Sequence, residues 1–294
     1  MSVDVEDWFQ VENLKAAIQR DSWNEREYRV ERNTETLLSI FEATETRATF
    51  FCLGWVAERS PHLIGRIREA GHEIASHGFD HYLVYDQQPS AFRRDVERAK
   101  AVLEDVSGSE VTGYRAPSFS ITDWALQILA ETGHRYDSSV FPVTGHDRYA
   151  TLALNEETRL GAAPIYRVAL GSRNAPPYDR EREAASATEI YELPIATLRT
   201  AGRVLPWGGG GYFRLIPYAI YEAGFARAVG QGRAGMFYLH PWEVDPDQPR
   251  VEGIKWSYRF RHYTNLDKTA PRLRRLCERF SFGTARELIN RARS

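Results

Sequence analysis

The sequence predicts an α/β protein in which repeated strand–helix units build a parallel sheet or barrel. Three observations support this class. Short apolar runs alternate with amphipathic helical segments through the first two thirds of the chain. Glycines stand where several of these helical segments should end, as at Gly71 and Gly133. A length of 294 residues fits one large barrel with added loops.

The first half of the chain contains the clearest strand and helix patterns. Residues 1–5 form an apolar strand that begins almost at the first residue. The helix expected at 34–45 places Leu37, Leu38 and Phe41 on one face, with Asn33 as its N-cap. A β-rich run follows at 47–53. The helix expected at 61–70 begins at a proline, and a short strand is expected at 73–77.

The same alternation continues further along the chain. The long helix expected at 89–106 places Phe92, Val96, Ala99 and Leu103 in step. A strand at 111–114, a helix at 122–132 and a strand at 135–137 come next. The last barrel strands are expected at 190–195 and 236–240, with a helix at 217–230 between them, and a helical tail is expected at 266–293.

Two segments are less regular. Residues 141–187 contain four prolines and many polar residues, which predicts an irregular insertion with long loops and a hairpin. The Gly208–Gly211 run lacks the Lys-Ser/Thr ending of a phosphate-binding loop, so we expect a tight loop beside a cleft or a plain turn. We expect a single domain over 1–294, with a core over about 1–242 and an extension over about 243–294.

Composition excludes several functional classes. The net charge is −2 and charged residues make up 27% of the chain, so no electrostatic footprint for nucleic acid or an anionic membrane is present. Two cysteines, Cys52 and Cys277, do not make a disulfide framework, and Cys52 lies in an apolar run. The N-terminus has neither a basic nor an apolar leader pattern, and no apolar stretch predicts a membrane span. We therefore expect a cytoplasmic protein.

Four polar motifs follow predicted strands. His77 and His81 form an HxxxH pair, whose imidazoles can meet one metal ion if the segment turns helically. Asp4, Glu6 and Asp7 lie at the end of the first strand, where barrel enzymes place their chemistry. Taken alone, the histidines are better explained as unrelated surface residues, and the acids as a solvated strand end.

The other two motifs are an Arg-x-Pro and a Leu-x-His. Arg115 can orient a carboxylate through a bidentate bond, and His240, at the end of an apolar strand, can be a general acid. Each also has a structural alternative, namely an ordinary loop arginine or a hydrogen-bonded core histidine. All four motifs fall at carboxyl ends of predicted strands, and this shared position favours a common site.

With these motifs the chain resembles the polysaccharide deacetylases of carbohydrate esterase family 4, which have the nodulation-type deacetylase domain. The resemblance covers roughly residues 1–242 and is closest to the deacetylases of exopolysaccharide loci that accompany the exosortase system. It rests on the runs SVDVEDWF, IASHGFDH, GYRAPSFS and FYLHPW, together with LPWGGGGYF and RFRHY. It implies a distorted (β/α)7-type barrel and hydrolysis of N-acetyl groups on an amino-sugar polysaccharide or its precursor, in exopolysaccharide biosynthesis.

The resemblance also implies roles for these residues. His77 and His81 would bind a divalent metal. Zn²⁺ is the expected ion, with Co²⁺ or Ni²⁺ as alternatives. The third ligand would be Glu6, with Asp7 as the alternative because the adjacent aspartates of the family motif are absent here. Asp4 would be the general base.

The remaining roles concern the base's partner, the acid and the oxyanion. Arg115 would position the base and His240 would be the general acid, with Asp137 as the carboxylate that tunes it. A backbone N–H near Ser118 would hold the oxyanion.

Two departures from the family pattern bear on the substrate. Gly78 and Tyr82 replace the usual hydroxyl and proline around the second histidine, and Ser118 replaces an aromatic residue. Neither removes a ligand, but both reshape the cleft. Two other functions stay open at this point: hydrolysis of a small cyclic amide or ureide on the same barrel, and non-catalytic carbohydrate binding.

Overall fold

The structure, a computed structural model, describes residues 1–142, 152, 165–170, 189–232 and 235–293. Its main sheet, within those residues, has eight strands in the order β10-β1-β2-β3-β4-β5-β7-β6. All neighbours pair in parallel except β6, which runs antiparallel to β7. The strands are β1 Ser2–Val5, β2 Thr49–Cys52, β3 Glu73–Ser76, β4 Gly113–Tyr114, β5 Tyr136–Asp137, β6 Tyr166–Ala169, β7 Glu189–Glu192 and β10 Tyr238–Leu239.

The parallel part of the sheet curls back on itself. Beyond the end of β7, Ile195 forms a parallel bridge with Met236, just before β10. A second bridge joins Gly209 to Tyr238. These bridges bring the β7 side of the sheet to β10 at its other edge, which confirms the predicted distorted (β/α)7-type barrel. Closure through single bridges leaves part of the wall without regular strand pairing.

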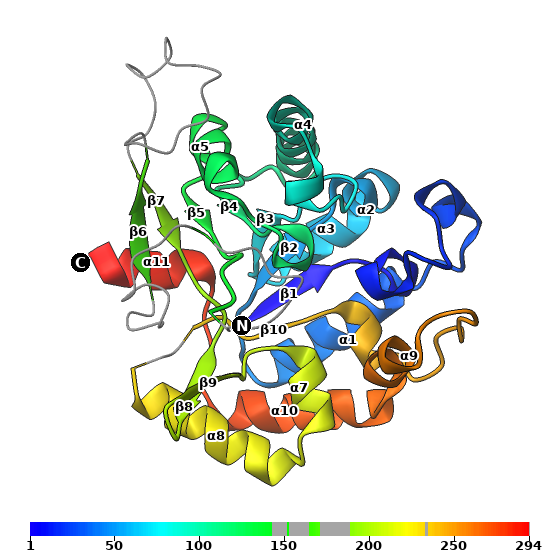
Figure 1. Cartoon of the computed structure of the whole chain (residues 1–294), viewed down its shortest axis with the longest axis vertical. Coiled ribbons are helices and arrows are strands. Elements are labelled where there is room, and N and C mark those ends of the chain that lie inside the picture. Colours follow the sequence, from blue (N-terminus) through cyan, green and yellow to red (C-terminus); the bar gives the residue numbers. More distant parts are fainter. Residues whose placement is uncertain (143–151, 153–164, 171–188, 233–234, 294) are drawn as a thin grey trace.

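Helices cover the outside of the curled sheet (Figure 1). They are α1 Val30–Ala43, α2 Gly54–Arg59, α3 Pro61–Glu69, α4 Pro89–Ser107, α5 Asp123–Glu131, α7 Gly210–Leu215, α8 Tyr218–Gly230, α9 Trp256–Tyr263, α10 Thr269–Arg279 and α11 Ala285–Arg293. In the described part of the chain no helix is both long and apolar enough to cross a membrane.

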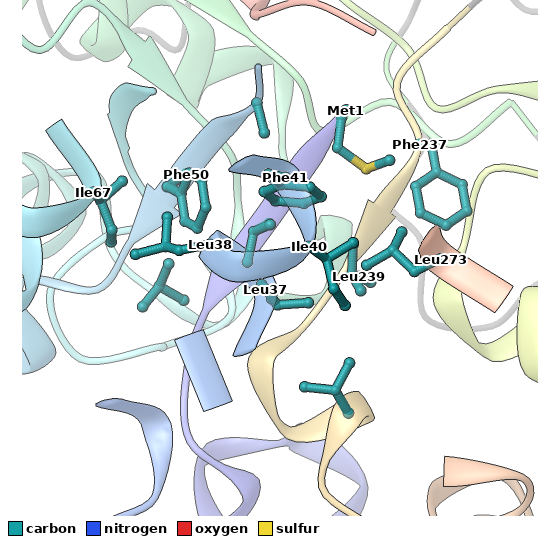
Figure 2. Packing of buried hydrophobic residues seen from close by; sticks show 14 of the residues in the cluster. Met1, Leu37, Leu38, Ile40, Phe41, Phe50, Ile67, Phe237, Leu239 and Leu273 are labelled. Atoms are coloured by element: carbon teal, nitrogen blue, oxygen red, sulfur yellow. The ribbon is translucent and has the colours of Figure 1, made fainter. Parts of the chain in front are cut away.

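Strands β1, β2 and β3 are buried along their whole length. Phe50 and Phe51 are neighbours on β2 and point to opposite sides of the sheet. Phe50 packs in the outer core with Leu37 and Phe41 of α1, and Figure 2 shows these three side chains between helix and sheet. Phe51 belongs to the inner core of the barrel.

The C-terminal tail closes one end of the barrel. The backbone N–H of Ala285 donates to Thr49 Oγ1 at 2.8 Å, and that of Arg286 donates to Glu73 Oε2 at 3.0 Å. Thr49 and Glu73 are the first residues of β2 and β3. Helix α11 therefore covers the amino ends of the strands, and Figure 1 shows it, in red, on the side away from the arrowhead of β1. The carboxyl ends remain available for the site.

Several expectations about local structure were wrong. Helix α1 begins at Val30, so Asn33 is not its N-cap but lies inside it and donates to Asp245. The Gly208–Gly211 run is neither a loop nor a turn throughout, because α7 begins at Gly210.

Other elements were not anticipated. Strands β8 Thr197–Thr200 and β9 Arg203–Pro206 form a separate antiparallel pair, and α9 is a helix before the tail. Most of the insertion expected at 141–187 lies outside the described residues, although β6 within it pairs antiparallel with β7, which follows it. Cys52 is buried, as predicted.

Candidate active site

The polar motifs meet at the carboxyl ends of the parallel strands. Asp4 lies on β1 and Glu6 directly after it, while His77, Arg115 and His240 follow β3, β4 and β10. A pocket of about 320 Å³ opens there. Its lining includes Asp4, Glu6, His77, His81, Ser118 and His240. The parallel sheet thus gathers residues that lie more than 230 positions apart in the sequence.

Asp4 and Arg115 form a fully buried ion pair. Arg115 donates from Nη1 to Asp4 Oδ1 at 2.5 Å and to Ser2 Oγ at 2.9 Å. Its Nε and Nη2 donate to the backbone oxygen and the hydroxyl of Ser138. Hydrogen bonds from all three guanidinium nitrogens therefore fix the orientation of Arg115, and Oδ1 of Asp4 is held in place. The other oxygen, Oδ2, faces His240 Nε2 at 4.0 Å.

Glu6, His77 and His81 form a three-residue donor set. One potential ligand atom from each lies within 4.8 Å of the others, and all three side chains are buried. His77 Nδ1 is 2.8 Å from the backbone oxygen of Arg115, a contact that requires a proton on Nδ1 and leaves a lone pair on Nε2. Burial and the neighbouring His81 hold the pKa of His77 well below its ordinary value, so this ring is neutral.

The donor set fits a divalent metal. Glu6 Oε2 lies 2.8 Å from His81 Nε2, yet among the described residues this buried oxygen has no hydrogen-bond partner of acceptable geometry. A buried carboxylate oxygen without a donor is costly unless a cation compensates it. Two imidazoles and one carboxylate are the protein ligands of many catalytic zinc sites.

The histidines approach each other through a loop rather than a helical turn, which corrects the geometry expected from the HxxxH spacing. Gly78 has φ +76° and His81 has φ +57°. A side chain at Gly78 would also approach Asp95 Oδ2, at 2.8 Å from its Cβ. Asp95 on α4 accepts the backbone N–H groups of Phe79 and Asp80, and so holds the loop between the two histidines.

Asp7, the alternative ligand, lies outside this donor set, because both of its carboxylate oxygens accept backbone hydrogen bonds. Its Oδ1 accepts the backbone N–H of Trp8 at 2.8 Å. Its Oδ2 accepts those of Arg29 and Val30 at 2.6 and 2.9 Å. Asp7 therefore caps two helices, including α1, and this explains why α1 begins four residues before the predicted start.

His240 is paired with Glu243, not with Asp137, which corrects the predicted tuning carboxylate. His240 Nδ1 lies 2.8 Å from Glu243 Oε1, and Nε2 lies 3.4 Å from Glu6 Oε1. Burial alone would lower the pKa of His240, but the bond to Glu243 and the charge of Glu6 raise it to about 9. Asp137 instead lies beside Glu192 of the neighbouring strand and accepts from Ser139.

Glu243 is in turn held by Arg214, a residue that the sequence motifs did not indicate. Arg214 Nε donates to Glu243 Oε2 at 2.7 Å, and both side chains are buried. Burial would raise the pKa of Glu243, but Arg214 and His240 lower it to about 2. The only sequence signal for Glu243 is its position three residues after His240, where it forms a capping box.

Two further features shape the pocket. Trp242 stacks between His240 and His262, at centroid distances of 5.1 and 4.3 Å, and so fixes the plane of the His240 ring. Ser118 and Phe119 have φ +51° and +58°, an unusual pair of left-handed residues that turns the backbone at the pocket wall. Both residues line the pocket.

Comparisons with known proteins give matches to two family models and to curated deacetylases. Residues 21–136 match the polysaccharide deacetylase family, and residues 138–290, more than half of the chain, match a domain of unknown function, DUF3473. A peptidoglycan deacetylase of Helicobacter pylori is 29% identical over 108 residues, 35% of this chain and 36% of that protein. A peptidoglycan-N-acetylglucosamine deacetylase of Bacillus cereus is 26% identical over 102 residues, 35% of this chain and 47% of that protein.

These matches span less than half the length of either curated relative. Among solved structures, a Mycobacterium smegmatis protein assigned to the polysaccharide deacetylases aligns over 100% of this chain and 88% of its own, with a TM-score of 0.60 and 18% identity. At that identity the similarity supports the fold alone. The match over 138–290 shows that this chain belongs to the proteins with the DUF3473 domain, and its residues 21–136 match the polysaccharide deacetylase family.

Proposed function

We propose that the protein is a metal-dependent N-deacetylase of an amino-sugar polysaccharide or its precursor, acting in exopolysaccharide biosynthesis. The observation that supports this best is the meeting of three groups in one pocket: a Glu-His-His donor set, a buried Asp–Arg pair and a histidine paired with a carboxylate. Hydrolysis of an amide needs an activated water, a base and an acid, and the three groups supply these roles.

Glu6, His77 and His81 would hold the metal, for which zinc is expected from the ligand types and cobalt or nickel would be substitutes. When bound, the metal would polarise the acetyl carbonyl and make a water molecule more acidic. The ring of His77 is already oriented by its bond to the backbone oxygen of Arg115. Arg115 therefore contacts both His77, through its backbone oxygen, and Asp4, through its guanidinium.

Asp4 is the proposed general base. Arg115 occupies its Oδ1, so Oδ2 is the atom that takes the proton of the attacking water. The buried ion pair holds Asp4 in one orientation. Ser118 lines the pocket, and its backbone N–H would donate to the oxygen that becomes negative as water adds to the carbonyl.

His240 is the proposed general acid. The carboxylate of Glu243 bonds to Nδ1, which favours the protonated ring and directs Nε2–H toward the acids on β1. When the C–N bond breaks, its electron pair goes to nitrogen, and Nε2–H supplies the proton that the departing amine needs. Without this proton transfer the amine would return to the carbonyl and re-form the amide.

The substitution Asp4→Asn tests this proposal. We expect acetate release from N-acetylated oligosaccharides to fall by at least about 10²-fold, because the base is lost. Binding of the same oligosaccharide, measured by calorimetry, should change little. A wild-type protein that binds the oligosaccharide but releases no acetate would instead be a non-catalytic carbohydrate-binding homologue. Turnover of cyclic amides or ureides in place of the sugars would indicate the other C–N hydrolase.

A further inference from the structure

We propose that Gly210 and Arg214 of α7 position the general acid, by seating the Glu243 carboxylate that holds His240. This inference rests on the proposed function and extends it to the DUF3473 half of the chain. It also assigns a role to the glycine run, which the deacetylase mechanism leaves unexplained. Gly210 is not among the pocket-lining residues, and Arg214, although it lines the pocket, has its guanidinium bonded to Glu243 and to backbone oxygens. Both would act through Glu243, so they are positioning residues.

Gly210 leaves the space in which the Glu243 carboxylate lies. A Cβ added at Gly210 would overlap both carboxylate oxygens of Glu243. The backbone at Gly210 has no positive φ, so the requirement for glycine is steric. The atoms in conflict belong to the end of a side chain and not to backbone, so a methyl group there displaces Glu243 without breaking the barrel wall. Gly208 differs, because its added Cβ would meet the backbone oxygen of Met236 at 2.6 Å.

Arg214, one turn further along the same helix, binds the Glu243 carboxylate through its guanidinium. Besides the 2.7 Å bond to Glu243, its guanidinium donates to three backbone oxygens at the end of α9 and just beyond it. These are the oxygens of Arg261, His262 and Thr264, at 2.9, 3.3 and 2.7 Å. Arg214 is 2% exposed, so these bonds hold it rigidly.

The consequence is a short chain of contacts from α7 to the departing amine. Gly210 and Arg214 set the position of Glu243, Glu243 holds His240 Nδ1, and His240 Nε2 delivers the proton. A displaced Glu243 would slow only reactions in which the leaving group must be protonated. An amide needs that proton, whereas a nitrophenyl ester releases a stable phenolate without it.

The test compares two substrates across two glycine variants. Gly210→Ala is the probe, and Gly65→Ala on α3 is the matched control, because a Cβ at Gly65 meets nothing within 4 Å. For an N-acetylated chito-oligosaccharide we expect kcat of Gly210→Ala to fall at least about tenfold with KM nearly unchanged. For 4-nitrophenyl acetate we expect less than about a threefold change. Asp4→Asn should lose both activities, which shows that the ester is hydrolysed in the same site.

Each other outcome is decisive. If Gly210→Ala deacetylates as well as Gly65→Ala, or if amide and ester activities fall together, the positioning role is refuted while the proposed function stands. A wild-type protein that releases no acetate refutes the proposed function itself. Should Gly210→Ala fail to fold, Glu243→Gln replaces it, with the same split between amide and ester expected. Equal loss on both substrates in Glu243→Gln would overturn the inference.

Discussion

The buried pair of Asp4 and Arg115 gives the most direct prediction about stability. Arg115→Met removes four hydrogen bonds and leaves Asp4, 2% exposed, as an uncompensated buried carboxylate. Breaking a buried pair in this way costs about 3–5 kcal/mol. For a chain of this size that corresponds to a fall of roughly 6–20 °C in Tm. Asp4→Asn should cost less, because an amide oxygen can still accept from the arginine.

The assay is urea unfolding followed by tryptophan fluorescence, with a chelator present for every variant so that metal binding does not contribute. The double variant Asp4→Asn/Arg115→Met should be more stable than the sum of the single effects predicts, by about 2 kcal/mol or more. Arg135→Met is the matched control. Arg135 pairs with Glu110 at 2.8 Å, but its side chain is 65% exposed, so its loss should cost less than about 1 kcal/mol.

The reasoning is refuted if Arg115→Met is no less stable than Arg135→Met, or if the two single effects simply add. Either result would mean that the ion pair does not hold the base. The position of Asp4 would then need another explanation.

Three further predictions concern other parts of the molecule. Glu6→Gln should weaken divalent-metal binding at least about tenfold in a dye-competition titration. Asp7→Ala should leave metal binding unchanged, but it should lower the free energy of unfolding by about 1–2 kcal/mol because the helix caps are lost. Burial, with the charge of Arg47, lowers the pKa of His72 from 6.5 to about 4. The unfolded state therefore binds more protons, stability falls as the pH drops from about 6.5 to 4, and His72→Gln should flatten this dependence of the urea midpoint. Phe50→Ala should cost about 3–5 kcal/mol in the same unfolding assay, since the ring is fully buried.

The sequence was sufficient for the fold class because the barrel depends on repeated local patterns. Strand and helix alternation is visible wherever an element packs one consistent face, as in α4 with its four core positions in step. The strands themselves are short, and β4 and β5 have two residues each, so their limits could not be located by composition. The β8–β9 hairpin was missed because its strands show no strong apolar alternation.

The candidate site was predictable where the chemistry lies in contiguous motifs at strand ends. Asp4, His77, His81 and Arg115 lie together as the motifs suggested, and Glu6 joins the histidines. What the sequence could not reveal depends on contacts between distant segments. The start of α1 is set by Asp7, which lies more than twenty positions earlier.

The partner of His240 shows the same limit. Its carboxylate comes from Glu243, whose seat depends on a glycine and an arginine of α7. Asp137 was the predicted partner, but it ends β5 beside Glu192 of the next strand. Choosing between two such carboxylates requires the direction of each side chain, which strand position alone does not give.

The central claim is that the Glu-His-His set holds a metal needed for deacetylation. The most direct measurement is metal content by elemental analysis, paired with acetate release from N-acetylated oligosaccharides before and after chelation. We predict about one divalent ion per chain, loss of acetate release on chelation, and recovery on adding zinc or cobalt. Full acetate release from metal-free protein, or a bound ion with no release from any N-acetylated sugar, would contradict it.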